Sequence, residues 1–127
     1  MDEKIVREFI YKHLISIYNG DFETYKETTS DDLGLYEWFV TPHRIDGLKF
    51  HEFMMKNNWA GTKSGFNFEL QDMRIQIYDN TAIVSYTLLL SKIKNDEIEH
   101  KVINESRVIV KINGNLKVVH VHKSPGK

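Results

Sequence analysis

The fold of this chain is decided by residues 66–122, FNFELQDMRIQIYDNTAIVSYTLLLSKIKNDEIEHKVINESRVIVKINGNLKVVHVH. Hydrophobic and polar residues alternate through most of this stretch, which is the period of strands with one buried face. The turn dipeptides Asp79-Asn80, Asn95-Asp96 and Asn113-Gly114 separate the apolar runs. Such dipeptides favour two-residue hairpins, because Asn, Asp and Gly tolerate left-handed backbone. We therefore predict an antiparallel meander of four strands.

The alternation changes phase inside the first of these strands. The hydrophobic positions of the first phase are Phe66, Phe68 and Leu70, and those of the opposite phase are Met73, Ile75 and Ile77. One extra residue in a strand produces such a change and bends the strand. The pattern predicts a bulge near Gln71-Asp72 and a curved sheet.

The residues before the sheet have a helical period. Hydrophobic residues recur at helical spacing from Ile5 to Tyr18. Asn19-Gly20 favours the left-handed backbone conformation that ends a helix. Asp21 is a suitable cap for a second helix that runs to about Thr28, and Asp46 for a third helix at 47–58. A strand is predicted at 33–39. The predicted fold class is therefore α+β, with three N-terminal helices packed on a curved, mainly antiparallel sheet.

Composition narrows the possible functions. The 127 residues fit one domain, residues 1–127, and the 17 basic and 18 acidic residues are interspersed, which argues against nucleic acid as a partner. No apolar run is long enough to span a bilayer, and the N-terminus has no signal-peptide pattern, so no membrane partner is predicted. The sequence contains no cysteine, which favours the cytoplasm.

Counting outward from the hairpin turns predicts a polar island on one face of the sheet. The count places Arg107 opposite His120, and Glu105 opposite both His122 and Tyr86. A charge on an apolar face is costly unless it is paired. Arg107 is therefore expected to pair with Glu105, to bind an anionic ligand, or to do both. A structural ion pair and a ligand pocket both remain open.

The opposite face of the predicted sheet is apolar too. Its hydrophobic residues are Ile83, Leu89, Val102, Val108, Val119 and Val121. Three helices cannot readily cover both sides of the sheet, so a second copy of the chain is the predicted cover. The alternative is a monomer that exposes these side chains on a strongly twisted sheet.

Several segments together resemble the association domain of calcium/calmodulin-dependent protein kinase II. This domain belongs to the nuclear transport factor 2-like superfamily, which also holds SnoaL-like proteins. The matching segments are SIYNGDFETY (16–25), Tyr36-Glu37, IDGLKFHEF (45–53) with Asn57 and Trp59, NESRVIV (104–110) and GNLKVVHVHKS (114–124). The chain departs from the kinase pattern at Leu88, which replaces a second pocket arginine, and at Glu52 and Leu116.

The resemblance implies a cone-shaped domain with a cavity on the concave side of the sheet, lined by the arginine that corresponds to Arg107. It also implies dimers, and rings built from dimers. We therefore expect a self-assembling domain that encloses a small-molecule pocket, with a small organic ligand as a second partner and without catalysis. The expected ligand-binding residues are Tyr86, Glu105, Arg107, His120 and His122.

The alternative function is a small-molecule isomerase, cyclase or dehydratase of the SnoaL-like type. Its acid or base would come from His120, His122, Tyr86 or Glu37, and Arg107 would stabilise an oxyanion. His120 and His122 beside Glu105 could also suggest a metal, but no clear third ligand is available, so neither a metal site nor a cofactor is predicted. His13, His43 and His100 are interpreted as surface or helix residues, and His51 as structural.

Overall fold

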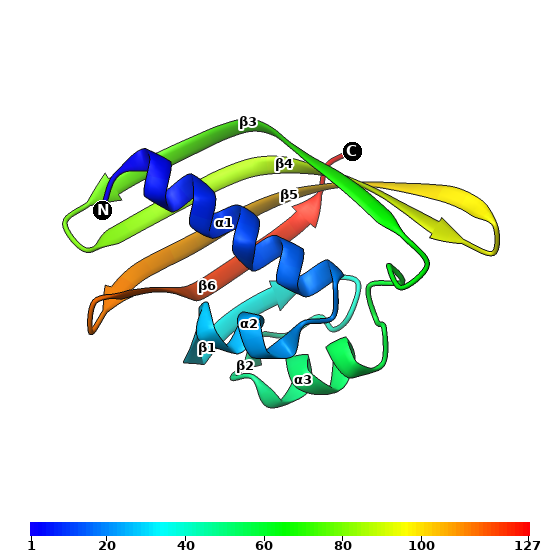
Figure 1. Ribbon diagram of the computed structural model, residues 1–127, viewed down its shortest axis with the longest axis horizontal. Coiled ribbons are helices and arrows are strands. Elements are labelled where there is room, and N and C mark those ends of the chain that lie inside the picture. Colours follow the sequence, from blue (N-terminus) through cyan, green and yellow to red (C-terminus); the bar gives the residue numbers. More distant parts are fainter.

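The computed structural model describes residues 1–127 and has an α+β architecture. Its elements are α1 (Glu3–Tyr18), α2 (Phe22–Glu27), β1 (Thr29–Glu37), β2 (Ile45–Asp46), α3 (Lys49–Lys56), β3 (Phe66–Tyr78), β4 (Thr81–Lys94), β5 (Glu97–Ile112) and β6 (Asn115–Pro125). The strands form one sheet in the order β2-β1-β6-β5-β4-β3. Only β1 and β6 pair in parallel. Figure 1 shows a curved sheet with the helices on one side of it.

The first two helices form where the sequence predicts them. Asp2 caps α1 by accepting a hydrogen bond from the backbone N–H of Ile5 at 2.9 Å. Asp21 caps α2 in the same way, through the N–H of Thr24 at 3.2 Å. Gly20 between the two helices has a φ of 66°, so the chain turns there at little steric cost. The result is that α1 and α2 both turn apolar side chains toward the sheet.

The predicted meander is confirmed. The three hairpin turns lie at the three predicted dipeptides, and Asp79, Asn95 and Asn113 have positive φ values near 50°. The register of β3 and β4 shifts between Gln71 and Arg74, which confirms the predicted bulge. The sheet can therefore bend around the helices.

Two sequence-based boundaries are wrong. The strand predicted at 33–39 is β1, which ends at Glu37. It starts four residues earlier than predicted because it follows α2 directly. The helix predicted at 47–58 covers only Lys49–Lys56, and Asp46 does not cap it. Asp46 instead lies in β2 and accepts a hydrogen bond from Arg44 at 2.6 Å.

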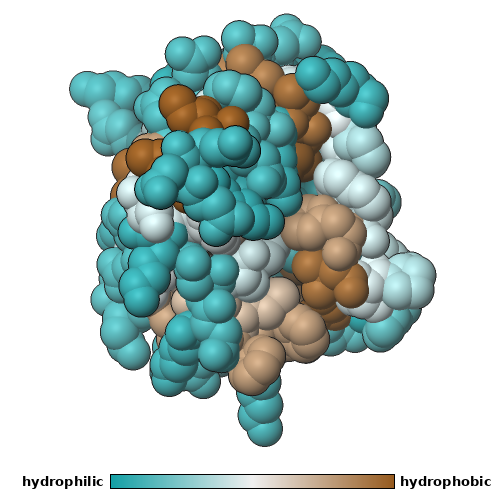
Figure 2. Space-filling view, turned by 90° about the vertical axis from the view of Figure 1, so that its right-hand side faces the viewer, coloured by the Kyte–Doolittle hydropathy of each residue, from teal (hydrophilic) through white to brown (hydrophobic).

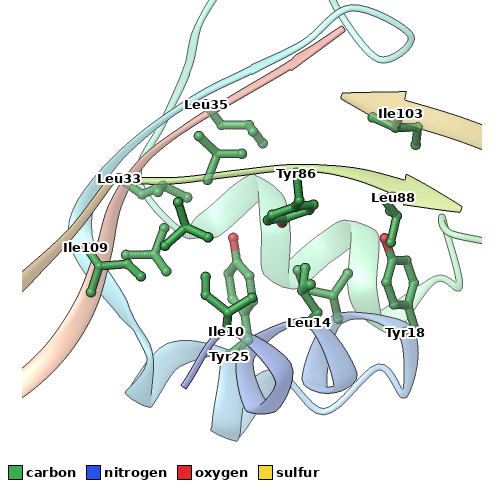
Figure 3. Close-up of a cluster of buried hydrophobic side chains, with 14 of the residues drawn as sticks. Ile10, Leu14, Tyr18, Tyr25, Leu33, Leu35, Tyr86, Leu88, Ile103 and Ile109 are labelled. Atoms are coloured by element: carbon green, nitrogen blue, oxygen red, sulfur yellow. The ribbon is translucent and has the colours of Figure 1, made fainter. Parts of the chain in front are cut away.

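The core lies between α1, α2 and the inner face of the sheet. Aliphatic side chains from the helices and from five strands meet there. Tyr18, Tyr25 and Tyr86 lie among them (Figure 3). Val6, Ile10 and Leu14 of α1 have no exposed surface. Burial of these side chains holds α1 in place, since each contributes about 1.5–3 kcal/mol relative to an exposed position.

Other large hydrophobic side chains remain at the surface. Figure 2 shows one face on which hydrophobic side chains gather among hydrophilic ones. The most exposed large hydrophobic residues of the chain are Ile98, Phe53, Tyr78, Ile5, Trp38 and Phe50. None of the helices is long and apolar enough to cross a membrane.

Candidate functional site

Arg107 is the centre of a polar cluster on the inner face of the sheet. It lies in β5, only 1% of its surface is exposed, and the side chain has three polar partners. Its Nε donates to the Tyr86 hydroxyl at 2.9 Å, and one terminal nitrogen donates to Glu105 Oε1 at 3.3 Å. The other terminal nitrogen lies 3.1 Å from His13 Nε2. A buried guanidinium needs such partners, because an unpaired charge would be costly there.

Glu105 forms an ion pair with Arg107, and Tyr86 is hydrogen-bonded to both residues. Tyr86 and Glu105 lie opposite each other on β4 and β5, and the Tyr86 hydroxyl donates to Glu105 Oε1 at 2.6 Å. Burial raises the pKa of Tyr86, so the hydroxyl keeps its proton. Burial alone would raise the pKa of Glu105 as well, but Arg107, Lys123 and the Tyr86 hydrogen bond together hold it below its ordinary value. Glu105 is therefore ionised at neutral pH.

His13 of α1 joins the cluster from the helix layer. Its ring is fully buried, and burial followed by the nearby Arg107 lowers its pKa well below 6.5. Because arginine can only donate, Nε2 of the neutral ring accepts the bond from Arg107. Nδ1 then carries the proton and donates to the Thr28 hydroxyl at 2.8 Å. The bond between His13 and Arg107 therefore connects α1 to β5.

A second buried ion pair lies beside the first. Glu37 of β1 and Lys123 of β6 are register partners in the parallel strand pair, and Lys123 Nζ donates to Glu37 Oε2. Lys123 Nζ also lies 3.9 Å from Glu105 Oε2, which links the two pairs. We call His13, Glu37, Tyr86, Glu105, Arg107 and Lys123 the buried polar network.

A small cavity borders the network. Its volume of about 10 Å³ leaves room for about one water molecule. The lining is Ile17, Tyr25, Leu35, Glu37, His51, Met55, Trp59, Arg107, Val121 and Lys123. Three buried polar atoms in this lining have no hydrogen-bond partner: Glu37 Oε1, His51 Nε2 and Trp59 Nε1.

His51 contributes a neutral ring to this lining. Burial is the main cause that lowers its pKa to about 4, and its Nδ1 lies 3.3 Å from the Gly47 carbonyl. Since a carbonyl can only accept, Nδ1 of the neutral ring carries the proton, and Nε2 is an acceptor without a partner.

The predicted positions of His120, His122 and Val121 are wrong. A bulge between Ile109 and Val108 adds one residue to β6, so that Arg107 faces Val121 and Glu105 faces Lys123. The histidines point to the outer face, where the His122 ring lies 5.0 Å from that of Tyr36. Val121, expected on the outer face, is buried in the core with 1% exposure. Such a shift of one residue turns every later side chain to the other side.

The remaining register predictions are confirmed. Tyr86 faces Glu105, and Val84 faces both Arg107 and Ile75. Of the predicted outer-face residues, Ile83 pairs with Val108 and Leu89 pairs with Val102, and all four are half-buried. Val119, the extra residue of the bulge, is half-buried as well.

Two members of the network were missed in the sequence. His13 was interpreted as a surface or helix residue, although it lies three residues after Ile10 and four before Ile17, on the buried side of α1. Lys123, interpreted as part of a strand end and a short tail, lies opposite Glu105 and is buried. Of the proposed acid–base residues, only Tyr86 and Glu37 lie on the inner face, so the structure does not bring a histidine from β6 to Arg107.

The comparisons with known proteins agree with this architecture. A family model described as the calcium/calmodulin dependent protein kinase II association domain matches residues 2–127. The Caenorhabditis elegans association domain of this kinase is 27% identical, with a TM-score of 0.86, and the match covers 96% of this chain and 94% of that one. The Chlamydomonas reinhardtii hub homology domain is 26% identical, with a TM-score of 0.86 and 96% of each chain covered.

A more distant neighbour supports the fold alone. A nuclear transport factor 2-like superfamily protein from Salmonella enterica is 21% identical and has a TM-score of 0.82. The match covers 98% of this chain and 90% of that chain. The predicted nuclear transport factor 2-like fold is thereby confirmed.

Proposed function

The chain belongs to the calcium/calmodulin-dependent protein kinase II association domain family, and from this premise we propose that it is a self-associating domain. In this proposal the outer face of its sheet packs against a second copy. The inner face encloses a small-molecule pocket, and the domain binds its ligand without catalysis. The setting is the cytoplasm, which suits a chain without cysteine.

The observation that carries the proposal is the uncovered outer face of the sheet. All three helices pack on the inner face (Figure 1), while the cross-strand pairs Ile83–Val108 and Leu89–Val102 stay half-buried on the outer side. Between these apolar pairs lies a shallow polar hollow whose lining includes Ser85, Ser106 and His122. An apolar surface with a polar centre can be buried by a symmetric copy, because each hydroxyl and imidazole can then find a partner.

The buried polar network supports the pocket. Arg107 lies on the cavity wall, and Tyr86 and Glu105 bond to its guanidinium. The guanidinium, the hydroxyl and Glu105 Oε1 are hydrogen-bonded to one another, while Glu105 Oε2 has no partner, and such a fixed network favours binding and stability over proton transfer. His120 and His122, the other predicted ligand-binding residues, belong to the outer face and are more readily assigned to the proposed dimer interface.

Native mass spectrometry on freshly purified protein tests both parts of the proposal. We expect at least a dimer, and a copurified small mass if the pocket is occupied. Val108→Lys places a charge in the proposed interface and should weaken association by about 2 kcal/mol, or about thirtyfold. Ile15→Lys is the matched control, because Ile15 is 42% exposed on α1 and lies away from the outer face. A wild-type protein that stays monomeric at micromolar concentration would remove the proposal.

A further inference from the structure

Two histidines lie next to each other on the outer face of the sheet, on the side away from the helices (Figure 1). The β6 bulge turns His120 and His122 to this face, and both rings approach Tyr36 of β1. The centroid of the Tyr36 ring lies 6.2 Å from that of His120 and 5.0 Å from that of His122. His122 is exposed, whereas His120 is already half-buried within the chain. A second copy on this face therefore changes the surroundings of His122 more than those of His120.

His122 belongs to a row of hydroxyl and ring side chains without a permanent charge. Its register partners are Tyr36 on β1 and Ser106 on β5, and Ser106 pairs in turn with Ser85 on β4. Ser85, Ser106 and His122 line a shallow hollow of about 280 Å³. Such a row can be buried at modest cost, because hydroxyls and a neutral ring can bond to the same groups of a symmetric copy.

The charged and titratable groups around His122 offer no free carboxylate to a proton on its ring. These groups come from β1, β2 and the segment before it, β3, β5 and β6, and they are Tyr36, Asp46, Arg44, Asp72, Arg74, Glu105 and His120. Asp72 lies on β3, and two strands separate β3 from β6, so about 14 Å lies between their backbones. Glu105 is held in the buried polar network, and Asp46 is paired with Arg44 at 2.6 Å. None of the ion pairs of the structure includes a histidine.

We propose that pH controls the self-association of this domain, with His122 as the residue that takes up the proton. The neutral ring is covered when two outer faces meet, and a protonated ring keeps the copies apart. This regulation rests on the self-association of the proposed function and adds the condition under which it occurs.

The sign of the effect follows from the loss of water around the ring. Histidine in water gains its proton at about pH 6.5, and removal of water without a carboxylate partner disfavours the charged form. The associated state therefore binds fewer protons than the separate copies, so association is strongest above about pH 6.5 and weakens as the pH falls. A symmetric interface covers His122 of both copies. Each ring contributes about tenfold between pH 7.5 and 5.5, so association should weaken by about a hundredfold.

Sedimentation velocity over a dilution series measures the dissociation constant of self-association at pH 7.5, 6.5 and 5.5. For the wild type we expect this constant to rise about threefold by pH 6.5 and about a hundredfold by pH 5.5. His122→Gln keeps a polar side chain that cannot be protonated, and its constant should change less than about threefold over the whole range. His43→Gln is the matched control, because His43 is exposed in the segment between β1 and β2, and it should follow the wild type.

His122→Lys fixes a positive charge at the same position. Its association should be about a hundredfold weaker than that of the wild type already at pH 7.5 and should respond little to pH. His13 and His51 are unchanged in all variants, so their effect on folding is common to them. Circular dichroism checks folding at each pH, and where a protein is unfolded at pH 5.5, the constants at pH 7.5 and 6.5 decide.

Two results would overturn this regulation. The dissociation constant of the wild type could stay the same from pH 7.5 to 5.5, or His122→Gln could keep the pH dependence of the wild type. Either result leaves self-association in place and rejects only its control by His122. A wild type that is monomeric at pH 7.5 rejects the proposed self-association itself, and the regulation with it, so the two failures are distinguishable.

Discussion

Replacement of Arg107 by methionine tests whether the buried polar network holds the fold together. Methionine keeps much of the aliphatic volume but removes three hydrogen bonds, to Tyr86, Glu105 and His13. Glu105 then keeps Lys123 as its nearest cation, at 3.9 Å, and remains buried. Loss of one partner from a buried ion pair costs about 3–5 kcal/mol, so we expect the free energy of unfolding to fall by about 4 kcal/mol.

Urea unfolding at a fixed protein concentration measures this loss, because self-association makes stability depend on concentration. The double variant Arg107→Met/Glu105→Gln should recover about 2 kcal/mol of it, since glutamine removes the unpaired charge and still accepts from Tyr86. Arg44→Met is the control. The Arg44–Asp46 pair is exposed, and its loss should leave the unfolding midpoint within error of the wild type. The reasoning fails if Arg107→Met costs less than about 1 kcal/mol, or if the two changes simply add.

Further predictions concern pH and register. Because burial lowers the pKa of His51 to about 4 in the folded chain, against 6.5 for the free side chain, the unfolded chain binds the proton first as the pH falls. Stability should decrease below pH 6.5, and His51 accounts for about 2 kcal/mol of this loss between pH 7.5 and 5. Because the pKa of His13 is lowered too, His51→Gln should reduce the slope of the urea midpoint over that range without removing it. An unchanged slope in His51→Gln would contradict this. Val121→Lys should unfold the chain, whereas His122→Lys should leave its circular dichroism nearly unchanged, because the β6 bulge places the valine inside and the histidine outside. Equal tolerance of both lysines would mean that the register is different.

The bulge in β6 explains why the register predicted for β3, β4 and β5 is right and the register predicted for β6 is wrong. The phase change in β3, between Leu70 and Met73, predicted a bulge that the structure confirms. A similar change occurs in β6, where Leu116 and Val118 alternate in one phase and Val119 and Val121 in the other. A count from the hairpin turn does not include the extra residue Val119, and it therefore places His120 and His122 on the wrong face.

The helices and strands of this protein follow from local signals in the sequence. Its capping residues, its turn dipeptides and the periods of its hydrophobic residues encode two helices, three hairpins and a curved sheet, because these signals act between residues close in the chain. The composition of the buried polar network depends instead on long-range packing. His13 approaches Arg107 across 94 positions, and Glu37 approaches Lys123 across 86, through the packing of α1 and the parallel pairing of β1 with β6. Contacts over such separations depend on how whole elements pack. The hydrophobic period of one helix or strand therefore does not predict which side chains will meet.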